Sequence, residues 1–188
     1  CLYPILEGTN EKRKGDGTMK ILSFGAGMQS TALALMSCDN AIAQTLGRPV
    51  PFPKVPVYDA VIICDLGFEP PWVQAQADFV GQKCRSVGIF YTSLDAPLYQ
   101  DLIRDFGKRR VVSIPWWTLS DDGHKSKMPR NCTLDYKVGL ISKYVRWELL
   151  GYRKGQRLKE EDKKAHEMHM GFSAEEKQRC KENPNPMF

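Results

Sequence analysis

A glycine-containing turn, SFGAGMQST at residues 23–31, lies between an apolar run and a stretch with helical spacing. A loop that leaves a strand and opens a helix presents free backbone N–H groups and the positive end of the helix dipole, and both favour an anion. Gly25 and Gly27 let the backbone approach a ligand, while Ser30 and Thr31 add hydroxyl donors. The turn therefore predicts a phosphate site, although a tight strand-to-helix turn capped by Ser30 would have the same sequence pattern.

Two other phosphate-binding patterns compete for this turn. The P-loop pattern GxxxxGK[ST] needs a lysine, and none stands between Lys20 and Lys54. The dinucleotide pattern GxGxxG is matched as GxGxxS, with Ser30 in place of the glycine that allows close helix packing. Its acidic residue is expected about 20 positions further on. Asp65 comes much later, so this pattern stays an alternative.

Polar residues after later apolar runs favour the same chemistry. Asp65 ends the run YDAVIICD, where its carboxylate can accept hydrogen bonds from a ribose or an adenine amine, and Gly67 allows the turn that follows. The prolines after Gly67 also suit a plain helix start. Arg130 and Lys137, in RNCTLDYKVGLI, would offer positive charge to phosphate or sulfate.

Periodic patterns predict the elements that position these residues. Apolar runs predict strands at 19–24, 58–65, 88–94, 111–117 and 166–173. Apolar residues three or four positions apart predict helices at 30–38, 73–87, 97–107 and 138–149, and the stretches 39–57 and 118–131 predict loops. Strands that alternate with helices predict an α/β fold with a Rossmann-like parallel sheet, helices on both faces, and a ligand at the carboxyl ends of the strands.

Length and composition set the broad class. The chain has 188 residues and a net charge of +5, which fits one domain with an anionic small molecule or a nucleic acid as ligand. No apolar run approaches the roughly 20 residues of a membrane span. Six cysteines without a CxxC pair argue against a zinc site and fit a reducing cytoplasm. Residues 1–18 predict a flexible extension before a domain at 19–188, whose abrupt end leaves open a longer parent chain.

The turn and three later segments resemble the PP-loop ATP pyrophosphatases and the related phosphoadenosine phosphosulfate (PAPS) reductases. SFGAGMQST is similar to their SGGxDS loop, with Gln29 in place of aspartate, as in the SFGxQ pattern of PAPS reductases. DLGFEPP is similar to DTGxxxPE, RNCTLDYKVGLI to R-x-C-[CT]-x-x-x-K-[VIL], and GFSAEEKQR to G-[IFL]-[RS]-x-[DE]-E-x-x-R. The four segments stand in the family's order between Phe24 and Arg179. The resemblance implies a PP-loop domain with the adenine nucleotide alpha hydrolase-like fold.

The resemblance also implies a nucleotide site and a choice of reactions. The ligand would be ATP, accompanied by Mg²⁺, or PAPS, and the reaction would be adenylyl transfer with pyrophosphate release or reduction of the sulfonucleotide. No iron–sulfur cluster and no metal held by the protein are expected, because Thr133 follows Cys132 and no CxxC lies downstream. Catalytic roles fall to Lys137, Arg130 and Asp65. The matched motifs imply nucleotide binding by Ser23, Phe24, Gly25, Ala26, Gly27, Met28, Gln29, Ser30, Thr31, Asp65, Gly67, Arg130, Lys137, Gly171 and Arg179.

Two other functions stay open. One is a nucleotide-binding sensor or subunit without turnover. The other is an enzyme of the same family that modifies a base in a nucleic acid, whose phosphates would contact KRR at 108–110 and YRKGQRLKEEDKK at 152–164. The acids interspersed in the second segment also suit a plain solvated surface. We expect a cytoplasmic protein without a membrane partner.

Overall fold

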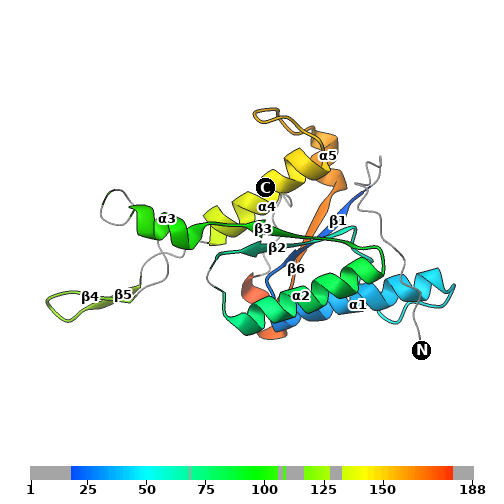
Figure 1. Cartoon of the computed structure of the whole chain (residues 1–188), viewed down its shortest axis with the longest axis horizontal. Coiled ribbons are helices and arrows are strands. Elements are labelled where there is room, and N and C mark those ends of the chain that lie inside the picture. The colour runs from blue at the N-terminus through cyan, green and yellow to red at the C-terminus, as the bar shows by residue number, and fades with distance from the viewer. Residues whose placement is uncertain (1–17, 68, 106–107, 109–116, 128–132, 180–188) are drawn as a thin grey trace.

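The computed structural model describes residues 18–67, 69–105, 108, 117–127 and 133–179. A four-stranded sheet with the order β3-β2-β1-β6 lies at its centre, and all three pairings are parallel (Figure 1). The α/β fold with a parallel sheet that the sequence predicts is thereby confirmed. Of the predicted extension, only Thr18 lies within the described residues. The strands are β1 (Lys20–Phe24), β2 (Ala60–Asp65), β3 (Phe90–Asp95) and β6 (Glu167–Met170).

Helices cover both faces of the sheet (Figure 1). The helices α1 (Met28–Thr45) and α2 (Pro71–Ser86) lie on one face. A continuous helical run lies on the other, formed by η1 (Thr133–Val138), α4 (Gly139–Tyr144) and η2 (Val145–Leu149), of which η1 and η2 are π-helical. Successive side chains of a strand point to opposite faces, which explains the unbroken apolar run of β2. Val61 joins the core beneath α1 and α2, and its neighbour Ile62 joins the core beneath α4.

The helix after the glycine turn is longer than the sequence predicts. It continues to Thr45, seven residues into the stretch expected to be irregular, because the prolines that forbid a helix begin only at Pro49. The buried Asn40 of this helix holds the proline-containing connection against it. The Asn40 Nδ2 donates to the carbonyls of Phe52 at 2.8 Å and Val55 at 2.7 Å, and its Oδ1 accepts from the Phe52 N–H at 3.0 Å. The connection between α1 and β2 is therefore packed on the domain.

A β-hairpin replaces part of the loop predicted at 118–131. The strands β4 (Trp117–Leu119) and β5 (Lys125–Lys127) pair antiparallel and project away from the central sheet (Figure 1). The turn between them places Gly123 at a φ of 80°, a conformation that glycine adopts without steric cost. The loop prediction was wrong for these strands, and the predicted strand at 111–117 lies almost wholly outside the described residues.

Three short helical segments complete the described part of the chain. They are α3 (Leu98–Asp105), α5 (Glu160–Ala165) and the 3-10 segment η3 (Ala174–Arg179). Among the described helices, none combines the length and the apolar character that crossing a bilayer requires.

Candidate functional site

The glycine turn follows β1, the strand at which the order of strand addition reverses from one side of the sheet to the other. From β1 the chain proceeds to β2 and β3 on one side, and β6 later adds on the other side. In an open parallel sheet, the carboxyl ends beside such a switch point form the usual ligand crevice. Here the residues that follow β1 and β6 begin with Gly25 and Gly171, and Asp65 ends β2. Three residues predicted for the site therefore lie along one edge of the sheet.

The backbone of the turn leaves open space for a ligand. A Cβ built at Gly25 would meet no atom within 4 Å, and one built at Gly27 would meet only the Gln29 side chain at 4.0 Å. Between them, Ala26 has a φ of 51°, a left-handed conformation that is unusual for a residue other than glycine. The N-cap of α1 is Gly27, and no side chain caps this helix end. Among the described residues, the amides of Met28 and Gln29 in the first turn of α1 have no side-chain partner and remain available to an anion.

The hydroxyl groups of the turn serve its own structure. The buried Ser30 Oγ donates to the Gly27 carbonyl at 3.1 Å and accepts a 3.4 Å hydrogen bond from the Gly25 amide, which is therefore engaged within the turn. The Thr31 Oγ1 accepts a 2.6 Å hydrogen bond from the Gln76 Nε2 of α2. Ligand contacts at the turn therefore depend chiefly on backbone N–H groups.

Other residues of the turn differ widely in exposure. Phe24 is buried and meets the Tyr91 ring edge-on at 6.3 Å between centroids, so its side chain belongs to the core. Ser23 and Gln29 are half-buried, whereas the Met28 side chain is 81% exposed.

Gly171 permits close packing between the end of β6 and the first turn of α1. A Cβ at this position would lie 2.5 Å from the Ser30 amide nitrogen and 2.8 Å from the Gln29 carbonyl carbon. Only glycine fits this approach of two backbones. The dinucleotide pattern places such a glycine at position 30, within the turn; here the neighbouring strand supplies it. The motif that predicts Gly171 as a ligand contact thus also marks a packing requirement.

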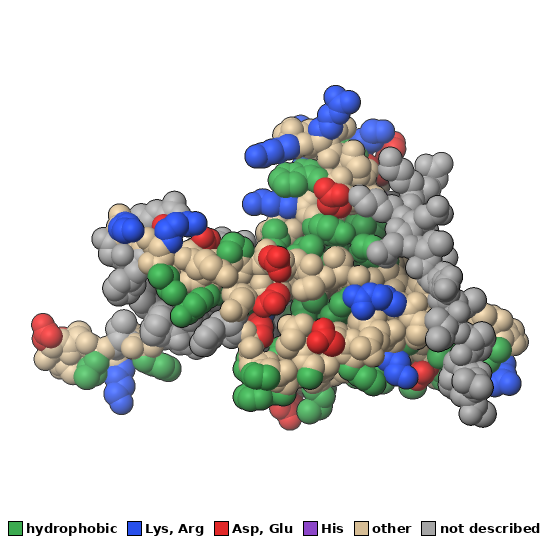
Figure 2. Space-filling view, in the orientation of Figure 1, with side chains coloured by type: hydrophobic (Ala, Val, Ile, Leu, Met, Phe, Trp, Pro, Cys, Tyr) green, Lys and Arg blue, Asp and Glu red, His purple; other side chains and the backbone are tan. Residues whose placement is uncertain are grey.

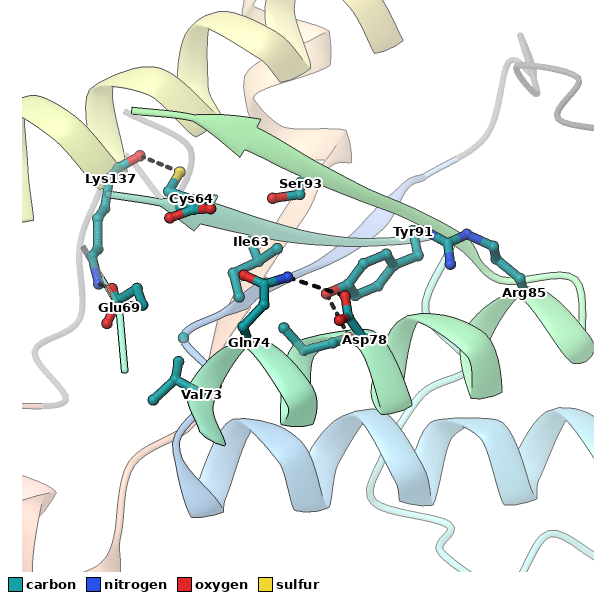
Figure 3. Close-up of a pocket in the computed structure, with 13 residues that line it drawn as sticks. Ile63, Cys64, Glu69, Val73, Gln74, Asp78, Arg85, Tyr91, Ser93 and Lys137 are labelled. Carbon is teal, nitrogen blue, oxygen red and sulfur yellow. Dashed lines mark hydrogen bonds and ion pairs between the residues drawn. The ribbon is translucent and has the colours of Figure 1, made fainter. Parts of the chain in front are cut away.

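A pocket joins three of the predicted segments (Figure 3). Gly25 of the turn, Asp65 of β2 and Lys137 of η1 line it together, although they are far apart in sequence. Its empty volume is about 540 Å³, open solvent included. The remaining lining residues come chiefly from β2, α2 and β3: Ile63, Cys64, Glu69, Val73, Gln74, Ala77, Asp78, Arg85, Tyr91 and Ser93.

Charged groups lie at the mouth of this pocket. The Lys137 Nζ is 3.8 Å from the Glu69 Oε1, and both side chains are partly exposed. The Asp65 Oδ1 accepts a 2.8 Å hydrogen bond from the Gly67 amide, and a φ of 78° at Gly67 makes that tight turn possible. Asp65 is thereby oriented at the end of β2 with its second carboxylate oxygen left for a ligand.

The motifs in the sequence do not include the polar wall that α2 contributes to the pocket. The Gln74 Nε2 donates to the Asp78 Oδ1 at 3.1 Å, and both side chains face the pocket beside the apolar Val73 and Ala77 (Figure 3). The spacing of four residues puts Gln74 and Asp78 on one side of the helix. Their place next to the buried stripe of α2 was the available signal, but the same pattern is common on solvated helices.

The cysteine of the pocket is unsuited to nucleophilic attack. Burial raises the pKa of the Cys64 thiol to about 11, and its Sγ donates to the Lys137 carbonyl at 3.7 Å. At neutral pH the side chain is therefore a thiol rather than a reactive thiolate. Its contact with the backbone carbonyl of Lys137 joins η1 to β2 and so helps to fix the position of the Lys137 backbone beside the pocket.

Two predicted cations stand outside or at the border of the described residues. Arg130 lies outside them, and Arg179 is the last residue of η3. His166 and His169, three residues apart in sequence, both make contacts within the fold: His166 accepts from the Met19 amide, and His169 lies between Tyr58 and Glu167. Within the described ranges, no three or more His, Cys, Asp or Glu side chains gather as a metal site would require.

Comparison of the chain with family models, with curated proteins and with solved structures finds no match in any of the three.

Proposed function

We propose that this chain binds an adenine nucleotide, ATP or PAPS, as a PP-loop protein of the adenine nucleotide alpha hydrolase-like class. The observation that supports this proposal is the shared pocket of Gly25, Asp65 and Lys137, because each comes from a different motif of the resemblance. If the three segments resembled the family only by chance, they would have no reason to line one pocket. Their meeting in one pocket therefore supports the proposal.

The chemistry of the pocket suits adenosine. Ile63, Val73 and Tyr91 supply apolar walls against which a purine can pack, while Gln74 and Asp78 carry hydrogen-bonding groups for its polar edge. In this orientation the ribose would lie toward Asp65. The phosphates would pass Gly25 and reach the uncapped first turn of α1, where backbone N–H groups and the helix dipole stabilise negative charge.

Lys137 would complete the site by exchanging partners. Its 3.8 Å separation from Glu69 is longer than a hydrogen bond, and the pair is partly exposed, so the pairing is weak. A phosphate or sulfate would compete for the ammonium group, with Arg130 and Arg179 as further proposed cations. When ATP is bound, Mg²⁺ would lower the charge of its phosphates, and Asp65 and Glu69 carry the oxygen ligands that this ion prefers.

Two reactions follow from this assignment. With ATP, a substrate oxygen would attack the α-phosphorus and release pyrophosphate, and the amides of α1 would stabilise the developing charge. With PAPS and a thiol reductant, the product would be sulfite. The protein should therefore be incubated with ATP–Mg²⁺ and, separately, with PAPS and a thiol. Binding without either product would identify a sensor or subunit.

The binding test uses two lysines on the same helical run. We expect Lys137→Gln to weaken nucleotide binding about 10- to 100-fold, the loss of one charge-assisted contact of roughly 1.5–3 kcal/mol. Lys143→Gln removes the same charge from the exposed side of α4 and should leave affinity unchanged. Gly27→Val should abolish binding without unfolding the domain, because the space around its Cβ is open. Unchanged affinity in both Gly27→Val and Lys137→Gln would refute the assignment.

A further inference from the structure

A second feature suited to an anion lies at the end of the helical run, away from the pocket. Residues 151–159, GYRKGQRLK, form a connection between η2 and α5 that we call the basic loop. It contains four cationic residues and no acidic residue. Lysine and arginine side chains gather over this connection in Figure 2. The four cations are all exposed, namely Arg153, Lys154, Arg157 and Lys159.

The cationic side chains of the basic loop form no ion pair with any residue that the structure describes. Within the described part of the chain, none of its four cationic side chains lies in a salt bridge. The acids that follow in sequence, Glu160, Glu161 and Asp162, occupy the first turn of α5, where the helix dipole stabilises negative charge. Asp162 is also the acceptor of the Tyr152 hydroxyl. Asp162 is thus engaged by a hydroxyl of the basic loop, and none of the three acids forms a salt bridge with a cation of the loop within the described part of the chain.

The backbone of the basic loop is held in place from within. The Gln156 Oε1 accepts from the Arg153 amide at 3.0 Å, and the Gln156 amide donates to the Arg153 carbonyl at 3.0 Å. Leu158 is buried, with 6% of its surface exposed, and the Lys159 amide donates to the Tyr152 hydroxyl at 3.2 Å. Because these contacts order the loop before binding, less conformational entropy is lost when a ligand engages its cations.

We propose that the basic loop binds the sugar–phosphate backbone of a nucleic acid. Four exposed cations on an ordered loop, none in a salt bridge with a described residue, present concentrated positive charge to the phosphates of a nucleic acid. The large apolar side chain of the loop, Leu158, is buried, and Tyr152 is half-buried with its hydroxyl engaged, so nothing on the loop suits insertion into a lipid surface. Because Tyr152 is half-buried, the loop offers no aromatic face to stack on bases. We therefore expect binding through the phosphates, without preference for a base sequence.

This binding surface is separate from the nucleotide pocket. Lys137 belongs to η1, at the beginning of the helical run. The basic loop follows η2 at the other end of that run (Figure 1). No residue of the basic loop lines the pocket. The proposal therefore does not depend on adenine nucleotide binding, and either can fail without the other.

Salt dependence of binding provides the test. With a short fluorescent DNA duplex, four phosphate contacts predict a slope of about −3.6 for log K against log salt, from roughly −0.9 per contact. Affinity should then fall about 150-fold between about 50 and about 200 mM salt. Arg157→Gln should reduce the magnitude of the slope by about one. The quadruple variant R153Q/K154Q/R157Q/K159Q should lose nearly all binding.

A charge-matched variant controls for net charge. R48Q/K54Q/K83Q/K125Q removes four exposed cations elsewhere and should keep both the slope and the affinity nearly unchanged. All of these positions are exposed, and circular dichroism would verify that each variant is folded; should the quadruple variant unfold, Arg157→Gln still decides. An equal loss in both quadruple variants would overturn the proposal, as would a wild-type chain that does not bind the duplex at about 50 mM salt. Loop-dependent binding to vesicles of anionic lipid, but not to the duplex, would assign the surface to a membrane instead.

Discussion

Replacing Gly171 by alanine should destabilise the domain strongly, through a single added methyl group. The new Cβ would lie 2.5 Å from the Ser30 amide nitrogen, 2.8 Å from the Gln29 carbonyl carbon and 2.9 Å from the Ser30 Cα. All three atoms belong to the backbone of the first turn of α1, so no side-chain rotation can relieve the overlap. Overpacking typically costs 1–3 kcal/mol, and we expect about 3 kcal/mol here because a strand or a helix must move.

Thermal unfolding measures this cost directly. In a domain of this size, each kcal/mol lowers Tm by about 2–4 °C, so Gly171→Ala should lower it by roughly 6–12 °C. Gly27→Ala is the matched control: its φ of −85° suits alanine, its Cβ would meet nothing closer than 4.0 Å, and the expected change is below about 1 kcal/mol. A Gly171→Ala variant that melts within about 2 °C of the wild type would refute the close-packing argument.

Two further predictions concern stability. Asn40→Ala removes the three hydrogen bonds that hold Phe52 and Val55, and should lower the unfolding free energy in urea by about 2–4 kcal/mol; Asn40→Asp, which keeps only the acceptor, should also destabilise. Burial raises the pKa of Cys64 to about 11 and those of Tyr58 and Tyr91 to about 12. Because the unfolded chain releases these protons at lower pH, stability should be full below about pH 9 and fall as pH rises toward about 12. The measurement is the free energy of unfolding in urea at several pH values across this range. A free energy that does not fall would contradict the raised pKa values of these buried groups.

The sheet and its covering helices were predictable because burial leaves a regular mark on the sequence. The apolar run of β2 and the stripe of Ala77, Val80 and Cys84 on α2 are both consequences of contact with the core. The hairpin was missed because its strands have only three residues each and bury no continuous apolar face. The Asp-Gly pair at its turn was the signal that could have indicated it.

The pocket was predictable only in outline. Gly25, Asp65 and Lys137 stand in recognisable motifs, and the structure brings them to one pocket. Gln74 and Asp78 complete the same wall, but polar residues on a helix carry no mark that separates a ligand contact from a solvated surface. The packing role of Gly171 depends on β6 lying beside β1, a pairing across most of the chain that no local pattern encodes.

That pairing has a consequence for how the protein is made. Lys20 of β1 pairs with Glu167 of β6, so 147 residues must be synthesised before one side of β1 gains its neighbour. At about 5–20 residues per second, a ribosome needs roughly 7 to 30 s for that interval. Throughout it, β1 presents unpaired backbone groups that can join the strands of other nascent chains. The glycine turn, too, reaches its final packing only when Gly171 leaves the ribosome and settles against Ser30.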